Sequence, residues 1–177
     1  AFWPDWFSPG SYGSFTLIHE IGHALGLKHT FQAVGFVLTT LPPSEDGYPY
    51  SVMSYSAYPG YAGSTVSFNP TTPMLYDIAA IQYLYGPNMS YHAGNDIYTF
   101  SQGQNYFQTI WDAGGTDTIV WDASTEGATI DLRPGAWSDL GNTLTFLNSS
   151  GSFLTSNSNT VAIYYTVTIE NATGGQT

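Results

Sequence analysis

Three of the four histidines in this 177-residue chain lie within eleven residues of one another. His19, Glu20 and His23 form the pattern H-E-x-x-H, and Gly26 and His29 extend it to H-E-x-x-H-x-x-G-x-x-H. In a helix, positions i and i+4 lie one turn apart on the same face. Two imidazoles at this spacing can hold one Zn²⁺, with the intervening glutamate turned toward a water on the metal. The third histidine lies beyond a straight helical face, and Gly26 permits the positive φ that a sharp return needs. The motif therefore predicts a three-histidine zinc site; three satisfied core histidines are the alternative.

Two helices are predicted, with a long turn-rich segment between them. The apolar run Phe15–Leu27 contains no proline, Ser14 stands at its N-cap position, and Gly26 can end it. Because its apolar residues cover more than one face, this helix is expected to be largely buried. Residues 30–73 are rich in turn sequences and are expected to be mostly loop. A second helix is predicted over Met74–Tyr85, with a proline opening it and Gly-Pro after its end.

The character of the sequence changes near residue 91. Short stretches of alternating hydrophobicity, separated by turns of Gly, Asn, Asp and Ser, predict strands. These stretches are Asn95–Phe100, Thr118–Val120, Ala128–Leu132, Thr143–Leu147 and Val161–Ile169. We place a boundary at 87–92 and expect an α+β chain. Its helical and loop-rich part covers residues 1–90, and an all-β part, a sandwich or β-roll, covers residues 91–177.

Charge and composition exclude several classes of partner. Two Lys+Arg against 13 Asp+Glu give a formal net charge of −11. Two basic residues, Lys28 and Arg133, cannot form a phosphate-binding stripe, so we expect neither nucleic acid nor an anionic membrane surface as a partner. No apolar run approaches the roughly 20 residues that cross a bilayer. The absence of cysteine excludes disulfides, zinc fingers and thiol nucleophiles, and this acidic, Gly- and Asn-rich composition suits a secreted bacterial protein stabilised by calcium.

A second motif follows the histidines. Ser51-Val52-Met53-Ser54-Tyr55 matches the Met-turn that accompanies the long histidine motif in metzincins. With both motifs the chain resembles the serralysin family of secreted bacterial zinc proteases, and the resemblance covers nearly everything from residue 14 onward. The segments that carry it are His19–His29, Glu45-Asp46, Ser51–Tyr55, Thr72–Gly86, Gly94–Phe100, Ile110–Thr118 and Val167–Gly175.

The resemblance implies a zinc-dependent endopeptidase that hydrolyses peptide bonds through a metal-bound water. It implies that Glu20 is the general base and that Met53 forms an apolar floor beneath the metal. Tyr55 would be a fifth zinc ligand in the resting enzyme and would swing away to stabilise the transition-state oxyanion. An aromatic packing residue is the alternative for Tyr55. The implied zinc ligands are His19, His23 and His29, with Gly26 as the structural residue of the turn.

The resemblance also implies calcium in the β part. Carboxylates spaced around glycines, as in residues 112–117 (DAGGTD), can surround a hard cation with oxygens, but such a segment by itself is only a polar turn. The family commonly has arginine where this chain has His92, and a backbone carbonyl ligand survives that change. The first implied site uses the backbone of His92 and Gly94 with Asp96, Asp112, Gly114 and Asp117. The neighbouring site uses Gly115, Asp117, Thr168 and Glu170.

The chain departs from the family pattern before the zinc helix. Metzincins place a twisted sheet and a helix there, and the edge strand of that sheet aligns the substrate, whereas only about 14 residues precede the helix here. Three explanations remain: a fragment of a larger enzyme, a separate polypeptide that supplies the missing part, or a reduced form without ordinary protease activity. We expect the fragment, because the chain also stops at Gly174-Gly175-Gln176, where the Gly-Asp calcium repeats of serralysins gather.

Two functions are therefore compared. The first is a secreted, extracellular zinc endopeptidase, or the catalytic-core fragment of one, that acts on polypeptide substrates. A proteinaceous inhibitor or a separate N-terminal fragment are its further candidate partners. The second is a non-catalytic calcium-binding module for secretion or adhesion that retains a vestigial zinc site. The intact Glu20 favours the first function, because a decayed site would be free to lose it.

Overall fold

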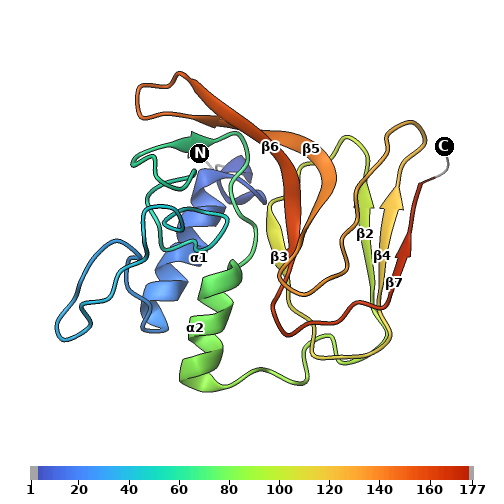
Figure 1. Ribbon diagram of the computed structural model, residues 1–177, viewed down its shortest axis with the longest axis horizontal. Coiled ribbons are helices and arrows are strands. Elements are labelled where there is room, and N and C mark those ends of the chain that lie inside the picture. Colours follow the sequence, from blue (N-terminus) through green and yellow to red (C-terminus); the bar gives the residue numbers. More distant parts are fainter. Residues whose placement is uncertain (1–3, 176–177) are drawn as a thin grey trace.

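A computed structural model describes residues 4–175 of the chain (Figure 1). Residues 1–3 and 176–177 lie outside the described residues, and the latter include Gln176 of the C-terminal motif named above. Two α-helices come first and most strands follow, so the α+β prediction is confirmed. The elements are a 3₁₀-helix η1 (Pro4–Phe7), α1 (Tyr12–Ala24), β1 (Thr65–Val66), α2 (Leu75–Tyr85), β2 (Ile97–Ser101), β3 (Gln108–Ile110), β4 (Thr118–Asp122), β5 (Trp137–Leu147), β6 (Phe153–Ile163) and β7 (Asn171–Thr173).

The strands form two sheets. In the four-stranded sheet, of order β1-β5-β6-β3, β5 pairs antiparallel with β1 and β6, and β3 joins β6 in parallel. The three-stranded sheet has the order β2-β4-β7 and is parallel throughout. In Figure 1 these three short strands lie side by side at the far end of the molecule from α1, with β3 and β6 between. Short parallel strands joined by glycine-rich turns are the β-roll-like arrangement expected for this part of the chain.

Helix α1 begins three residues earlier than predicted. Ser11, not Ser14, is the N-cap, and its hydroxyl accepts a hydrogen bond from the Ser14 backbone N–H at 3.2 Å. A Cβ placed on Gly13 would lie 2.3 Å from the backbone oxygen of Trp6, so only glycine lets this first turn pack against η1. That tertiary contact extends the helix beyond the apolar run. After the helix, Gly26 has a φ of +95°, as predicted for the return of the chain.

The prediction that this helix is largely buried is wrong. Phe15, His19 and Gly22 are buried on one face of α1, whereas Leu17 and Ile21 on another face are 51% and 50% exposed. Residues three and four apart share a helix face, so the buried set forms a single stripe against the rest of the molecule. Apolar residues on several faces predict burial only when a partner covers each face.

The second helix and the loop before it follow the prediction closely. Helix α2 begins one residue later than expected and ends at the expected residue, with Gly86 at its C-cap and a φ of +79° there. Between the two helices, β1 is the only named strand in the described part of the chain, and it contains two residues. The segment is therefore mostly loop, as its turn sequences indicate.

The predicted strands are correct in part. β2, β4 and β5 overlap three of the five predicted stretches. The prediction for Ala128–Leu132 is wrong, because this segment forms only an isolated bridge. The prediction for 161–169 extends too far, since β6 ends at Ile163. Val167 and Ile169 are buried and alternate with exposed residues, but they belong to no strand. Their alternating pattern therefore indicates burial rather than strand pairing.

Two hydrophobic cores hold the chain together, and each draws on both halves of the sequence. In one core, Leu75 and Ile78 of α2 belong to the same cluster as Ile119 of β4. In the other core, Met53 belongs to the same cluster as Phe146 of β5. Strand β1 likewise pairs with β5. The loops and helices that carry the histidines are therefore packed against the β part.

Candidate metal centre

The three motif histidines converge where α1 ends. Metal-binding atoms of His19, His23 and His29 all lie within 4.8 Å of one another. The ring centroids are 4.7 Å apart for His19 and His23, 5.3 Å for His19 and His29, and 4.6 Å for His23 and His29. Helix α1 places the first two rings one turn apart. The Gly26 N–H donates to the His23 carbonyl at 2.9 Å, and the turn formed there brings the His29 ring back beside the other two.

The two helical imidazoles are held through their Nδ1 atoms. His19 Nδ1 donates to the Val52 carbonyl at 2.7 Å, and His23 Nδ1 donates to the Leu27 carbonyl at 2.9 Å. A carbonyl oxygen can only accept, so Nδ1 carries the proton on each ring and Nε2 keeps a lone pair. This backbone support sets the tautomer that binds a metal through Nε2.

The third imidazole is oriented by a residue that the sequence analysis did not identify. The side-chain Oε1 of Gln32 accepts from His29 Nδ1 at 3.1 Å. Gln32 lies in the loop after the motif, and no local pattern marks it. Lys28 closes the same loop, because its ammonium donates to the backbone oxygens of Gln32 and Thr39, both at 2.8 Å. One of the two basic residues of the chain therefore stabilises the support of a candidate ligand.

The donor set fits a zinc ion. His23 Nε2 and His29 Nε2 face each other at 3.0 Å. With the proton of each ring on Nδ1, this contact sets two lone pairs against each other, and a cation between them removes the repulsion. Burial lowers the pKa of His19, and the nearby His23 and His29 add to this effect, so the neutral imidazole is favoured. Three neutral Nε2 atoms are the protein ligands of a three-histidine zinc site.

Glu20 and Tyr55 border the same cavity as the first histidine. This cavity has a volume of about 320 Å³, and His19, Glu20 and Tyr55 are among the residues that line it. The Tyr55 ring centroid lies 4.5 Å from that of His29, and the residue is 58% exposed, which disfavours the alternative of a packing aromatic. The ring of Phe31 stacks on His29 with centroids 5.2 Å apart and an interplanar angle of 6°. This contact was not expected from the sequence.

The Met-turn packs beneath the histidines. Met53 is 1% exposed, and a Cβ placed on Gly22 of α1 would lie 2.5 Å from the Met53 sulfur. Glycine at this position therefore allows the Met-turn to approach the zinc helix closely. Asp77 of α2 holds the turn in place. Its carboxylate accepts from the Ser51 hydroxyl at 2.6 Å and from the Val52 N–H at 2.8 Å.

Asp77 links α2 to a candidate zinc ligand. It is 2% exposed, and it also accepts from the Met74 N–H at 2.9 Å, which caps α2. Burial raises the pKa of Asp77 to about 6, although hydrogen bonds from Ser51, Val52 and Met74 oppose the shift. Since the Val52 carbonyl orients His19, a continuous set of contacts runs from α2 through the Met-turn to the imidazole. An acid in the first helical turn indicates a cap, but nothing local predicts this link.

A larger cavity is lined in part by the third histidine. It has a volume of about 690 Å³ and is bounded by the loop after the motif, the Met-turn and α2. Most of its lining side chains are apolar, and His29 lies at its border. The lining includes Leu27, Val34, Val37, Leu41, Ala80 and Leu84.

The predicted calcium ligands come from three segments, and the structure brings most of them together. Asp112 and Asp117 are 4% and 0% exposed. Asp117 Oδ1 accepts from the Asp96 N–H at 2.8 Å, and the Asp117 N–H donates to Glu170 Oε2 at 2.7 Å. The Gly114 N–H donates to Asp112 Oδ1 at 2.7 Å. The residues near 96, 112–117 and 170 therefore form one cluster of carboxylates.

One oxygen in this cluster is buried without a partner. Asp117 Oδ2 has no hydrogen bond, and burial raises the pKa of Asp117, with Asp112, Glu170 and Asp96 adding to the rise. A Cβ placed on Gly115 would lie 1.8 Å from the Gly94 carbonyl oxygen, so this close backbone approach requires glycine. An orphaned carboxylate oxygen in a cluster of carboxylates suits a hard cation.

One residue of the second implied calcium site is not joined to this cluster. Thr168 is exposed, and no hydrogen bond among the described residues ties its side chain to the carboxylates. Its neighbour in that implied site, Glu170, does contact Asp117 through the bond given above. The second site therefore has weaker support from the geometry than the first.

Comparisons with known proteins agree with this arrangement. Residues 10–97 match the family described as Met-zincin, and residues 76–177 match the family described as Peptidase M10 serralysin C terminal. The chain is 36% identical to serralysin of Proteus mirabilis over 94% of this chain and 34% of that protein. It is 37% identical to serralysin C of Dickeya chrysanthemi over 95% of this chain and 36% of that protein.

The chain spans about a third of the length of these curated relatives. No helix within residues 4–175 is both long and apolar enough to cross a membrane. The serralysin C-terminal family covers more than half of the chain, and the Met-zincin family covers the helix, the Met-turn and α2. With a zinc-binding histidine triad formed by α1 and the turn that follows it, and a β-rich part after them, the chain belongs to the serralysin family of metzincins.

Proposed function

We propose that this chain carries the zinc centre of an endopeptidase that hydrolyses peptide bonds in polypeptide substrates. One observation supports this proposal most strongly: three imidazoles converge with their Nδ1 atoms held by acceptors, and Glu20 and Tyr55 line the cavity beside them. A vestigial metal helix would have no reason to keep a carboxylate and a phenol at that cavity. The non-catalytic alternative is therefore less well supported.

The side chains of this cavity have separate roles. When bound at His19, His23 and His29, zinc supplies a Lewis acid that lowers the pKa of a water toward 7 and polarises a carbonyl. Glu20 takes a proton from the attacking water and delivers it to the leaving amine. Tyr55 donates a hydrogen bond to the developing oxyanion, and its exposure leaves its ring free to move into that position.

The larger cavity, which His29 helps to line, is proposed to receive a substrate side chain. Its walls are Leu27, Leu41 and the two valines of the loop, Val34 and Val37. The charged residues of the lining, Lys28 and Asp77, are already engaged in hydrogen bonds within the protein, so large apolar side chains fit the cavity best. If this assignment is right, the enzyme should prefer substrates with a bulky apolar residue next to the scissile bond.

Removal of zinc from the complete protein is expected to abolish peptide hydrolysis. A zinc-selective chelator should reduce the rate to background, and addition of one equivalent of zinc should restore it, because the imidazoles stay oriented by Val52, Leu27 and Gln32. The measurement is the cleavage rate of a fluorogenic peptide library at fixed calcium. Hydrolysis that survives complete zinc removal would contradict the proposal.

We also propose the division of labour along the chain. Residues 1–90 would carry the zinc centre, and residues 91–177 would form a calcium-binding part that supports it. The exposed face of α1, with Leu17 and Ile21, would be covered by a further part of the enzyme that also aligns the substrate. Secretion is the localisation that suits a cysteine-free, acidic member of this family.

Calcium is proposed to join the three distant segments of the carboxylate cluster. Removal of calcium should lower the melting temperature by about 5–10 °C and speed cleavage within residues 91–177, with zinc still bound. A cation held at 100 times its Kd contributes about 2.7 kcal/mol, and without it the acids around Asp117 repel one another. The measurement is a thermal melt with limited proteolysis at fixed zinc, with and without millimolar calcium.

Two variants control this experiment. Asp117→Asn should remove the response to calcium, whereas the same change at the exposed Asp5 should leave it intact. Identical melts and cleavage patterns with and without calcium would mean that the carboxylate cluster is only a set of turns.

A further inference from the structure

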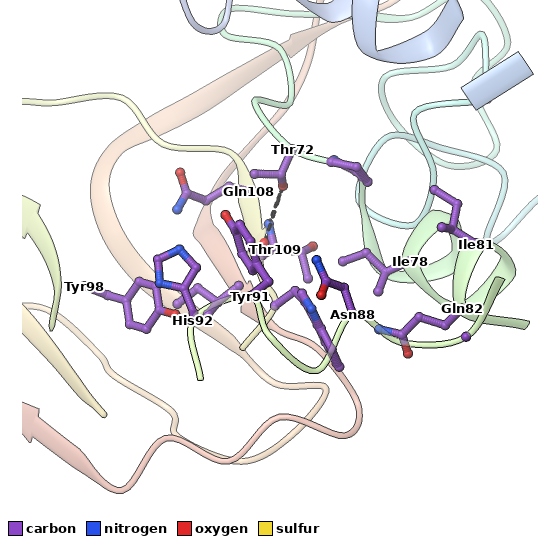
Figure 2. A pocket seen from close by; sticks show the side chains of 14 residues that line it. Thr72, Ile78, Ile81, Gln82, Asn88, Tyr91, His92, Tyr98, Gln108 and Thr109 are labelled. Atoms are coloured by element: carbon purple, nitrogen blue, oxygen red, sulfur yellow. Dashed lines mark hydrogen bonds between the residues drawn. The ribbon is translucent and has the colours of Figure 1, made fainter. Parts of the chain in front are cut away.

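A second group of metal-binding side chains lies in the β part. One ring nitrogen of His92 and one carboxylate oxygen each of Asp96 and Asp112 lie within 4.8 Å of one another. His92 Nδ1 approaches Asp96 Oδ1 to 3.0 Å. Figure 2 shows the His92 imidazole beside the Tyr98 ring, at one end of a pocket of about 380 Å³ that both residues line. Because His92 lines this pocket, an ion from solution can reach its imidazole there.

The three side chains are held in place before any ion binds. Asp112 accepts from the Tyr98 hydroxyl at 2.5 Å and from the Gly114 N–H at 2.7 Å, so both of its oxygens have fixed positions. The His92 ring packs against Tyr91, with centroids 4.3 Å apart, and against Tyr98, at 5.7 Å. Each oxygen of Asp112 keeps a lone pair for a further partner.

The cluster carries negative charge that no lysine or arginine neutralises. The sequence contains two such residues: Arg133 pairs with Asp131, and Lys28 closes the loop beside the motif histidines. Next to the cluster, Asp117 accepts the Asp96 N–H through Oδ1, while its buried Oδ2 has no partner. With no lysine or arginine at the three side chains and an orphaned carboxylate oxygen on the adjacent Asp117, a cation from solution is the partner that would balance the charge of the site.

The chemical types of the ligands indicate which cation the site prefers. An imidazole nitrogen is a good ligand for zinc and other first-row transition metals, whereas calcium takes oxygen ligands almost exclusively. Zinc binds nitrogen at about 2.0–2.1 Å and carboxylate oxygen at about 2.0–2.2 Å, so neighbouring ligands in a tetrahedral site lie about 3.4 Å apart. The 3.0 Å between His92 and Asp96 is close to that value, and all three ligand atoms lie within 4.8 Å of one another, so only a small side-chain movement is needed.

We propose that His92, Asp96 and Asp112 form a second transition-metal site, with the imidazole of His92 as its selective ligand. The site takes zinc, or a similar divalent ion such as cobalt, from solution through the pocket of Figure 2. It goes beyond the proposed protease function and does not depend on it. It shares two carboxylates with the proposed calcium site, so the two ions compete, and the imidazole favours zinc.

The experiment titrates zinc into the calcium-free full chain that already holds one zinc equivalent at the motif histidines. Wild-type protein is expected to bind one further equivalent. His92→Asn should weaken this second binding at least about 100-fold, since loss of a direct ligand costs no less than loss of a supporting one. Asparagine tolerates the positive φ of 50° at this position, so the variant keeps the backbone and its carbonyl. Calcium affinity, measured separately, should therefore stay within about threefold.

Two outcomes would overturn the proposal. Absence of a second zinc equivalent in wild type would overturn the proposal and leave His92 and Asp96 as a simple ion pair. Equal second-site affinity in His92→Asn would overturn it as well, because carboxylates alone would then suffice. If His92→Asn does not fold, Asp112→Asn tests the same site through another ligand and should also lose the second equivalent. If wild-type protein binds the second zinc equivalent but no calcium, the second-site proposal stands and only the calcium proposal is contradicted.

Discussion

Replacement of Glu20 by alanine is expected to lower kcat/KM for peptide hydrolysis by the complete protein about 10²–10⁴-fold. Glu20 lines the cavity beside His19 and is exposed, whereas the candidate metal donors are the three Nε2 atoms. The carboxylate therefore acts on a proton and contributes no metal bond, so zinc content should be unchanged. The measurements are steady-state kinetics and metal analysis on the same preparation.

The matched control for this prediction is Glu126→Ala. Glu126 is also exposed but lies in a turn of the β part, so the same loss of a carboxylate there should leave kcat/KM unchanged. Loss of zinc in Glu20→Ala would show that the carboxylate holds the metal, and the role of general base would then be wrong. Full activity in Glu20→Ala would be equally incompatible with that role.

Replacement of Asp77 by alanine is expected to lower the free energy of unfolding by about 3–9 kcal/mol. Three buried donors lose their acceptor at once: the Ser51 hydroxyl and the backbone N–H groups of Val52 and Met74. Each unsatisfied buried group costs about 1–3 kcal/mol. Because Val52 also orients His19, zinc affinity should fall together with stability. Urea unfolding and zinc titration measure the two effects.

Asp77→Asn provides the matched control, because its amide oxygen can still accept from the two backbone N–H groups. It also tests the pH dependence. Burial raises the pKa of Asp77 from 3.8 to about 6, so the folded state binds this proton more tightly than the unfolded state. The contribution of Asp77 to stability should therefore fall as pH rises from about 4 to about 6. The asparagine variant lacks this titration, so the stability of wild type relative to Asp77→Asn should fall over the same range. A difference that is constant or rises over this range would contradict the assignment.

The histidine cluster could be predicted from the spacing of its residues along the sequence. The interval between His19 and His23 matches one helical turn, and Gly26 takes the positive φ that a sharp return requires, so the short motif contains the geometry that gathers its own side chains. The same holds for α2, whose bounds agree with Met74–Tyr85 within one residue, because its stop signal is a local glycine. Such features depend on chain stereochemistry within a few residues.

The burial of side chains and the contacts that position each element could not be predicted in the same way. Leu17 and Ile21 are apolar yet half exposed, because no partner within the described chain covers their face of α1. The start of α1 depends on a contact between Gly13 and Trp6, and the strand predicted over 128–132 does not form. Hydrophobic periodicity records which residues favour burial, but not whether a surface is present to bury them.

The sequence by itself determined the identity and spacing of the histidines, the Met-turn, the α+β order of the chain and the acidic character of its β part. Only the tertiary structure decided what holds these groups: Asp77 under the Met-turn, the Val52 carbonyl behind His19, and Asp117 against the Asp96 backbone. The physical reason is that ligand spacing along one helix is a property of the local backbone. A hydrogen bond between distant segments exists only when the packed cores bring both partners to within about 3 Å of each other.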